Sequence, residues 1–305
     1  ISFFSYFSFF SFFSFLSLLY FISFFPFTNT PTNIFSIIFF LLFFFSFTCV
    51  AQTTQNDSPY EISWAVDGPW VGGGLGLNAL GLYLIQNKDA LTDAELANLS
   101  KDDVFFLDKW AAGNYSNSHN ELSYFPFYAS FATPVIFLLN KNERNHAGQI
   151  MVLFVETMAT TGAIYTLTAG TVQRSRPFVY NESLSDTKRK SNNSQRSFFA
   201  GHTAATASAT FFAAKVYQDF NPDSPYIPYV WAGAAIIPAS VAYLRTTSGN
   251  HFLTDNIIGY AIGAGVGILV PQLHKKGNEN FSFFPTMGQD LMGRNYNAIH
   301  LSYRF

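Results

Sequence analysis

The sequence contains one cysteine, Cys49, so no disulfide bond can form within the chain. It is also poor in charge: Asp, Glu, Lys and Arg make up 12% of the 305 residues, whereas soluble domains carry about a quarter. The formal net charge is −2, and this near balance argues against a nucleic-acid partner. So little charge with 49% hydrophobic residues is typical of a membrane protein, or of a helical protein with a large buried surface.

The first fifty residues differ in composition from the rest of the chain. Phe and Ser dominate residues 1–30, which we interpret as a low-complexity leader of the kind that a translated non-coding stretch would produce. An apolar run at residues 35–48 is followed by Cys49-Val50-Ala51 and then by a polar stretch. This order predicts a signal peptide cleaved after Ala51, with an uncleaved anchor as the alternative. The rest of the chain is therefore expected to be exported to the cell envelope.

Apolar segments of helical length recur through the remainder of the chain. They lie at residues 68–86, 124–140, 150–170, 200–216, 228–244 and 253–271. Several are rich in Gly and Ala, which lets helices approach one another closely. Most are shorter or more polar than the roughly 20 apolar residues of a clear spanning helix. The pattern predicts an all-α fold, a bundle of about six core helices that is membrane-embedded or membrane-associated.

Two segments outside these runs have patterns of their own. The stretch LTDAELANLSKDD, which begins at Leu91, predicts an amphipathic helix capped by Thr92 or Asp93. Apolar and polar residues alternate from Ile299 to the last residue, and a similar run begins at Phe281. Alternation with a period of two is typical of a strand, so we expect a short C-terminal β-hairpin or strand.

Three polar clusters lie at the ends of predicted helices. They are residues 173–177, which follow one apolar segment, residues 197–203, which open the next, and residues 245–255, which join the last two. If successive helices alternate in direction, all three clusters fall on the same side of the bundle. That arrangement would bring His202 and His251 together.

The residue types in these clusters suit a phosphate group. Guanidinium groups are planar forks that match phosphate oxygens in pairs, and the clusters contain Arg174, Arg176 and Arg245. His251 and Asp255 are four residues apart, so on a helix they would share a face. Asp255 would then accept a hydrogen bond from one ring nitrogen of His251 and leave the other nitrogen free as a nucleophile.

Gly201 and His202 open a predicted helix, where free backbone N–H groups favour an anion and His202 is placed to protonate a leaving oxygen. Taken singly, each of these features also fits a helix cap or a surface pair, and only their combination indicates a site. No spacing supports a metal site. The other four histidines are expected at the surface: His119, His146, His274 and His300.

The three clusters resemble the motifs of the type 2 phosphatidic acid phosphatases, whose superfamily also holds bacterial acid phosphatases and vanadium haloperoxidases. The family pattern is Lys-x6-Arg-Pro, Pro-Ser-Gly-His and Ser-Arg-x5-His-x3-Asp. The resemblance covers residues 124–272, and the third motif is the most specific match. The matching residues are Arg176-Pro177, Gly201-His202, and Arg245, His251 and Asp255 at the family spacing.

Four positions depart from the family pattern. Ala169 stands in place of the lysine, Phe199-Ala200 in place of Pro-Ser, and Leu244 in place of the serine before the third-motif arginine. Each loss removes a phosphate-binding donor. Candidates for supplying the missing charge are Arg174, Arg196 and Lys190.

The resemblance implies a phosphatase that hydrolyses phosphate monoesters, or diesters of the diphosphate type, through a phosphohistidine and without a metal or other cofactor. In that scheme His251 attacks phosphorus, Asp255 orients it, and His202 protonates the leaving alkoxide and later activates water. The phosphate-binding groups would be Arg176, Arg245, the Gly201 N–H and Arg174. The apolar bundle favours a lipid phosphate as substrate.

Two alternatives stay open, a vanadium-dependent haloperoxidase whose cofactor occupies the same site, and a catalytically degenerate envelope bundle. The expected partners are a phosphorylated lipid or small phosphate ester and a membrane, with no nucleic acid and an open oligomeric state. We expect the site to be periplasmic or outward-facing. The chain divides into a leader with a signal peptide or anchor (1–51), a helical and loop region (52–123), a phosphatase core (124–275) and a strand-like tail (276–305).

Overall fold

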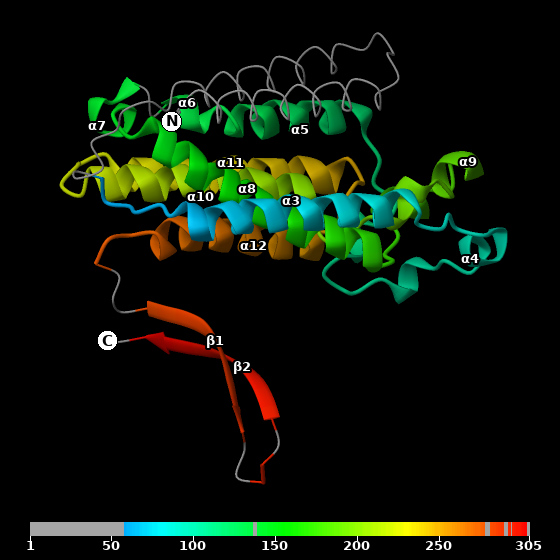
Figure 1. Ribbon diagram of the computed structural model, residues 1–305. Helices are drawn as coiled ribbons and strands as arrows, with labels where there is room; N and C mark the ends of the chain where they lie inside the picture. The colour runs from blue at the N-terminus through cyan, green and yellow to red at the C-terminus, as the bar shows by residue number, and fades with distance from the viewer. Residues whose placement is uncertain (1–57, 137–138, 278–280, 290–291, 294, 304–305) are drawn as a thin grey trace, which may run out of the picture. The chain divides into compact units, whose positions relative to one another are not determined.

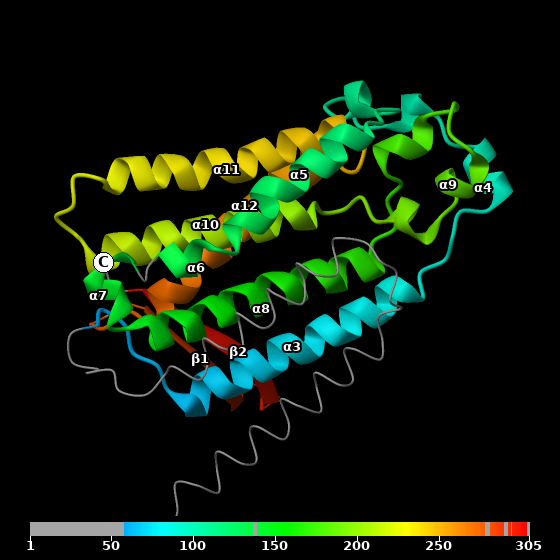
Figure 2. The same cartoon turned by 90° about the horizontal axis from the view of Figure 1, so that it is seen from above.

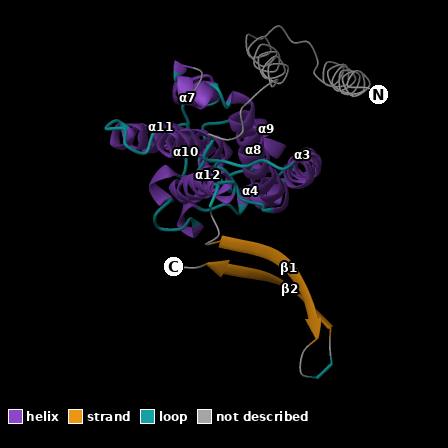
Figure 3. Ribbon diagram, turned by 60° about the vertical axis from the view of Figure 1, so that its left-hand side comes forward, coloured by secondary structure: helices purple, strands orange, loops and turns teal. Residues whose placement is uncertain are grey.

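The fold is described from a computed structural model (Figure 1). It describes residues 58–136, 139–277, 281–289, 292–293 and 295–303, all of which belong to the unit Gln52–Phe305. The predicted leader and the signal peptide or anchor lie outside the described residues. Within the described part, the regular elements are helical apart from one hairpin (Figure 3).

Six helices of 14 residues or more form the bundle in the described residues. They are α3 (Trp64–Gln86), α5 (Asn117–Ser130), α8 (Ala147–Thr171), α10 (Gly201–Phe220), α11 (Ile227–Thr247) and α12 (Leu253–Leu273). Helix α10 is central, because it packs against α5, α8, α11 and α12, while α3 packs against α8. Figure 2 shows α10 and α12 between α8 and α11. The predicted all-α bundle of about six core helices is confirmed.

Short helical turns connect the long helices. They are α4 (Asp93–Ala97), η1 (Lys101–Asp103), η2 (Lys109–Ala111), α6 (Thr133–Ile136), α7 (Lys141–Arg144), η4 (Pro177–Tyr180), α9 (Asp186–Arg189) and η5 (Asn192–Gln195). The predicted cap at Thr92 is confirmed. Its side chain accepts from the Glu95 N–H at 3.2 Å, and the Glu95 carboxylate accepts from the Thr92 N–H at 2.8 Å. This capping box satisfies two otherwise free donors, although the helix ends after five residues.

The apolar run at 124–140 does not coincide with one helix. Helix α5 begins earlier, at Asn117, because the Ser116 hydroxyl accepts from the His119 N–H at 3.3 Å and caps it. The helix ends at Ser130, and α6 follows as a separate turn. Pro134 is the second residue of α6, and because proline has no N–H it cannot donate to the Ser130 carbonyl and continue α5. A cap and a proline therefore decide bounds that hydrophobicity alone does not show.

A stripe of three glycines on α12 faces α10. A Cβ atom added at Gly263 would lie 2.1 Å from the Ala204 carbonyl oxygen, and one at Gly259 would lie 2.6 Å from that of Ala200. Gly267 meets α10 in the same way, one turn further on. Only glycine permits this closeness, since any side chain would overlap the backbone of α10. Because rising numbers on α12 meet rising numbers on α10, the two helices run parallel and begin at the same end of the bundle.

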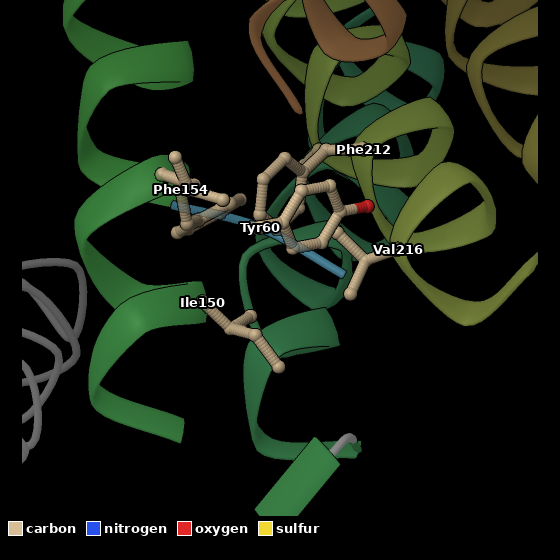
Figure 4. Packing of buried hydrophobic residues seen from close by; sticks show 7 residues of the cluster. Tyr60, Ile150, Phe154, Phe212 and Val216 are labelled. Carbon is tan, nitrogen blue, oxygen red and sulfur yellow. The ribbon is translucent and has the colours of Figure 1, made fainter. Parts of the chain in front are cut away.

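A buried apolar cluster joins α8 to α10 (Figure 4). The Tyr60 ring, from the segment before α3, lies between Ile150 and Phe154 of α8 and Phe212 and Val216 of α10. Ile150 is near the start of α8 and Val216 near the end of α10, so these two helices run antiparallel. The end of α8 therefore lies at the same end of the bundle as the start of α10.

Three of the helices, α8, α11 and α12, are long and apolar enough to cross a membrane by length and composition. Helix α11 also exposes large apolar side chains on its outer surface, and α3, α5 and α12 do so too. On α11 these are Tyr229, Ile236, Ile237 and Tyr243. Water does not favour such a surface, whereas lipid does, so these features support membrane association.

The C-terminal hairpin consists of β1 (Phe281–Gln289) and β2 (Asn295–Tyr303). The strands are antiparallel, with Phe281 opposite Tyr303 and Gln289 opposite Asn295. This confirms the predicted hairpin, and β2 begins four residues before the alternating run at Ile299.

Candidate active site

The ends of α8, α10, α11 and α12 meet through hydrogen bonds between the three polar clusters. His251 Nδ1 lies 2.6 Å from the Ser197 carbonyl oxygen, which joins the second cluster to the third. Arg176 donates through Nη1 to Asn250 Oδ1 at 2.9 Å, which joins the first cluster to the third. The structure therefore brings the three clusters together at one end of the bundle, as the alternating helix directions predict.

His251 lies between α11 and α12 with 1% of its surface exposed. A carbonyl oxygen only accepts, so the hydrogen bond to Ser197 places the ring proton on Nδ1 and leaves the Nε2 lone pair free. Burial lowers the pKa of His251 well below its ordinary value, and the charges of Arg176 and Arg245 lower it further. The neutral ring with a free Nε2 is the form that a nucleophile requires.

Asp255 does not hydrogen-bond to His251, contrary to the prediction. Its Oδ2 accepts from the Ser197 hydroxyl at 2.6 Å and from the Phe252 N–H at 2.9 Å. The physical reason is that α12 begins at Leu253, so no helical turn spans residues 251 and 255 and the four-residue rule does not apply. Asp255 instead holds Ser197, and the Ser197 carbonyl holds the histidine ring.

Arg176 and Arg245 are buried cations without counter-ions. They are 6% and 2% exposed, and among the described residues neither forms an ion pair. Their Nη1 atoms donate to the neutral side chains of Asn250 and Asn120, both at 2.9 Å, and the Nε of each has no hydrogen-bond partner there. Burial lowers the pKa of Arg176 to about 10, and the Arg245 charge contributes. Two buried positive charges in this state are suited to an anion by charge and geometry.

His202 lies in the first turn of α10 against aromatic rings of α5. Its ring centroid is 4.5 Å from that of Phe127 and 5.3 Å from that of Tyr124. Burial lowers the pKa of His202 well below its ordinary value, and the charges of Arg245 and Arg176 lower it further. The charge of His202 in turn lowers the pKa of His251. The two imidazoles and the two unpaired guanidinium groups thus act on one another electrostatically.

Gly201 begins α10, whose first N–H groups have no acceptor within the helix and carry its positive dipole end. Close packing against Tyr165 of α8 is a second reason for a glycine at this position. A Cβ atom there would lie 2.5 Å from the Tyr165 ring, so a larger residue would push α8 and α10 apart.

Arg174 has a different role from the predicted one in phosphate binding. Its Nη1 donates to Asp255 Oδ1 at 2.5 Å and its Nη2 to Asp108 Oδ2 at 2.7 Å, so two carboxylates already neutralise it. Asp108, which lies in none of the three clusters, also accepts from the Thr254 N–H at 3.0 Å in the first turn of α12. Arg174 and Asp108 therefore position the start of α12 and Asp255.

The other two cations proposed to replace the family lysine are also engaged elsewhere. Arg196 donates through Nη2 to the Ile85 carbonyl at 3.2 Å, at the end of α3. Lys190 pairs with Asp93 in a solvent-exposed contact. Neither contact points to a phosphate.

Lys88, which motif analysis missed, is buried against three backbone carbonyls near the site. Its Nζ donates to Ala169 at 2.9 Å, Val172 at 2.5 Å and Gln195 at 2.8 Å. These residues precede the segments that carry Arg176 and Ser197, and Ala169 is the position at which the family has its lysine. Burial, and then the nearby arginine charges, lower the pKa of Lys88 to about 8. The ammonium therefore links the segments that lead to Arg176 and Ser197 to the end of α8.

Two of the histidines expected at the surface are not there. His146 is 5% exposed, and the His274 side chain is 9% exposed between α3, α8 and α12. His119 Nδ1 contacts Thr247 Oγ1 at 2.9 Å. The His300 side chain lies outside the described part. Helix packing buried the first two, although polar neighbours in sequence suggested a surface position.

Comparison with known proteins agrees with this geometry. Residues 150–279 match the PAP2 superfamily. A similar solved structure is the crystal structure of the first transmembrane PAP2 type phosphatidylglycerolphosphate phosphatase from Bacillus subtilis, at 18% identity over 66% of this chain and 94% of that chain, with a TM-score of 0.41. No curated protein matches the sequence significantly. The family match spans both site histidines and both unpaired arginines, so this part of the chain is similar to the PAP2 superfamily.

Proposed function

We propose that the protein is a lipid phosphate phosphatase that works through a phosphohistidine intermediate. The match of residues 150–279 to the PAP2 superfamily supports phosphatase activity in general. The observation that carries the specific proposal is the pair of buried arginines without counter-ions, Arg176 and Arg245, next to a histidine whose Nε2 is free. A tetrahedral anion is the ligand whose charge and geometry both fit.

In the first step the Nε2 lone pair of His251 attacks phosphorus, the N–P bond forms, and the bond from phosphorus to the leaving oxygen breaks. His202 gives its proton to that oxygen. Arg176, Arg245 and the first N–H groups of α10 bind the non-bridging oxygens, which carry the charge. The pKa of His202 is low in the free protein, so the ring starts neutral. The negative charge of the bound phosphate raises this pKa, and the ring takes up a proton from solution before the first step.

In the second step His202 removes a proton from water, the water oxygen attacks phosphorus, and the N–P bond breaks. The attacking ring then returns to its starting form with the proton still on Nδ1. Ser197 and Asp255 hold that proton in place throughout, through the hydrogen bonds described above. The residues present therefore complete a cycle in which every proton has a donor and an acceptor.

A lipid substrate is supported by an apolar cleft beside the site. The cleft has a volume of about 480 Å³ and lies between α11 and α12. It includes Thr246, next to Arg245, and Leu253, two residues after His251. Its other lining residues are mostly apolar, among them Trp110, Tyr243, Ile257 and Tyr260. An acyl or prenyl chain lying there would leave its phosphate at the arginines.

Trapping the covalent intermediate tests the mechanism. Purified full-length protein in detergent is mixed briefly with ³²P-labelled lipid phosphate and quenched in base, where phosphohistidine survives. We expect label on the wild type, no label on His251→Ala, and slower turnover without loss of label on His202→Ala. Label on His251→Ala, or turnover without any labelled wild type, would contradict the proposed nucleophile.

A substrate panel tests the lipid assignment. Phosphatidate, phosphatidylglycerolphosphate and a polyprenyl diphosphate are compared with a water-soluble phosphate ester. We expect kcat/KM to be higher for at least one lipid, and Ile257→Asn in the cleft to lower only the lipid value. Equal values for all substrates would leave a phosphatase without lipid preference. Halide oxidation by peroxide with added vanadate, in place of phosphate release, would favour the haloperoxidase alternative.

We also propose an exported, outward-facing site, and labelling tests it. In a Cys49→Ala background, Thr187→Cys lies in α9 at the active-site end, and Asp223→Cys lies after α10 at the other end. Both positions are solvent-exposed. A membrane-impermeant maleimide added to intact cells should label position 187 and leave position 223 unlabelled. The reverse pattern would place the site inside.

A further inference from the structure

Three ionisable side chains meet at the opposite end of α12 from the active site. Asp67 comes from the first turn of α3, Glu156 from the middle of α8, and His274 from the C-cap of α12. His274 Nε2 lies 3.1 Å from Asp67 Oδ1 and 3.2 Å from Glu156 Oε2. One ligand atom from each residue lies within 4.8 Å of the other two. At about 1.5 Å per residue, α12 places this cluster roughly 28 Å from Asp255.

The tautomer of His274 makes this contact unusual. Its Nδ1 lies 2.8 Å from the Val270 carbonyl oxygen, which only accepts, so Nδ1 carries a proton. In the neutral ring, Nε2 then presents a lone pair to two carboxylate oxygens. A histidine that binds a metal through one ring nitrogen usually donates its other ring N–H to a carboxylate, a backbone carbonyl or water.

Glu156 supplies an independent sign of a missing ligand. It is fully buried, and neither of its carboxylate oxygens has a hydrogen-bond partner among the described residues. In the same part of the chain, neither Glu156 nor Asp67 pairs with a lysine or an arginine. With both carboxylates ionised, even a protonated His274 would leave one negative charge uncompensated, which is costly in a buried place. A divalent cation would balance both carboxylates with the histidine neutral.

The distances also fit a coordination sphere. Nitrogen and oxygen ligands lie about 2.0 to 2.2 Å from a zinc-type ion, so two ligands at octahedral or tetrahedral angles are about 3.0 to 3.5 Å apart. The two measured separations from Nε2 fall within that range. One imidazole with two carboxylates is a donor set for first-row divalent metals such as Zn²⁺ and Mn²⁺, whereas Mg²⁺ prefers oxygen alone.

We propose that Asp67, Glu156 and His274 bind one divalent transition-metal ion, which fastens α3, α8 and α12 together at the end of the bundle away from the active site. The Ser63 N–H donates to Asp67 Oδ2 at 2.6 Å and so orients this carboxylate, leaving Oδ1 for the metal. The ion stabilises the bundle and takes no part in phosphate chemistry. The site is a property of this chain beyond its proposed function.

Metal titration of the full-length protein in detergent tests the proposal. Protein stripped with a chelator is titrated with Zn²⁺, Mn²⁺ or Mg²⁺, and bound metal and thermal unfolding are measured. We expect one equivalent of Zn²⁺ or Mn²⁺, a rise in Tm on binding, and no response to Mg²⁺. The visible spectrum of a Co²⁺-loaded sample should report one nitrogen and two carboxylate ligands, without any need for a variant.

Two matched variants separate this site from metal bound elsewhere. Glu156→Gln should lose the bound equivalent and the metal-dependent rise in Tm, yet raise Tm in the stripped protein because it removes an unpaired buried charge. Glu143→Gln changes another buried glutamate, one that accepts from Asn221, and should keep the metal. No metal bound by the wild type, or equal binding by Glu156→Gln, would overturn the proposal.

Discussion

The two ends of helix α12 differ in the sign of the charge that is buried there without a partner. At its start, Arg176 and Arg245 have no carboxylate partner among the residues that the structure describes. At its end, Asp67 and Glu156 share a single histidine and no lysine or arginine within the described part. A protein buries unpaired charge only where something compensates it. The first end is therefore suited to an anion and the second to a cation.

Some other buried charges of the described chain have partners of opposite charge, whereas Lys88 and Glu143 have neutral hydrogen-bond partners. Asp219 accepts from Tyr60 at 2.8 Å, from Lys215 at 2.5 Å and from Lys275 at 2.6 Å. Arg174 has two carboxylates of its own. An unpaired ion in such a molecule marks a ligand site more strongly than it would in a poorly compensated core.

Removing a cation from the anion end should give the largest effect. We expect Arg245→Met or Arg176→Met to lower kcat/KM by about 10²- to 10³-fold, since each removes a donor to the charge of the transition state. The measurement is phosphate release from a soluble ester. Unfolding temperature should fall little, because a buried charge without a partner is replaced by an apolar side chain.

The matched change is Arg174→Met, which should lower the thermal stability of the protein. It leaves Asp108 and Asp255 buried without their cation, at a cost of about 3–5 kcal/mol, seen as a lower Tm. If Arg174→Met spared stability and weakened phosphate binding instead, the assignment of Arg174 to structure would be wrong.

Removing the Lys88 ammonium should lower activity less than removing Arg176 or Arg245. Lys88→Met removes the donor to three carbonyls, and a displacement of site groups by about 1 Å costs up to roughly 10²-fold. Because the pKa of Lys88 is lowered to about 8, wild-type activity should also fall as pH rises through 8, where the neutral amine keeps only two hydrogens for three acceptors.

The pH profile distinguishes positioning from simple loss of fold. Lys88→Arg should retain activity above pH 8, because guanidinium stays charged. Lys109→Met, which alters an exposed lysine paired with Asp102 at 3.6 Å, should leave the profile unchanged. An unaltered alkaline limb in Lys88→Arg would show that another group titrates there.

Enlarging a glycine of the stripe on α12 that faces α10 should disturb the packing at both ends of α12. Gly263→Leu forces a side chain against the Ala204 backbone, and overpacking costs about 1–3 kcal/mol. Gly265 lies on the same helix with nothing within 4 Å of a built Cβ, so Gly265→Leu is the control and should not lower Tm. An equal fall in Tm in the two variants would mean that helix propensity, and not the close contact between α10 and α12, causes the loss.

The smallest predicted effect is a proton taken up on phosphate binding. Burial and the two arginines keep the pKa of His202 low in the free protein, and a bound anion raises it, so binding near neutral pH draws a proton from solution. Calorimetry of phosphate binding in buffers of different ionisation enthalpy should give at most one proton more for the wild type than for His202→Gln. Identical uptake by both proteins would remove His202 from the role of acid.

Hydrophobic segments predicted most helix bounds well, since α12 spans Leu253–Leu273 against an expected 253–271. The prediction was poorest at α5, where the Ser116 cap and the Pro134 turn set the ends. The grouping of the three clusters was also predictable, because alternating helices carry their ends to the same side. The partner of His251 was not, because the helix that would have joined it to Asp255 starts two residues too late.

The sequence by itself determined the membrane-like composition, the helices and the three motifs, because periodicity, caps and spacing act over a few residues. The tertiary structure alone decided that Ser197 orients His251 across 54 residues, that Arg174 belongs to Asp108, and that His274 meets Asp67 across 207 residues. Such contacts depend on how closely helices pack and in which direction they run. Between α10 and α12, three glycines of α12 allow this close approach.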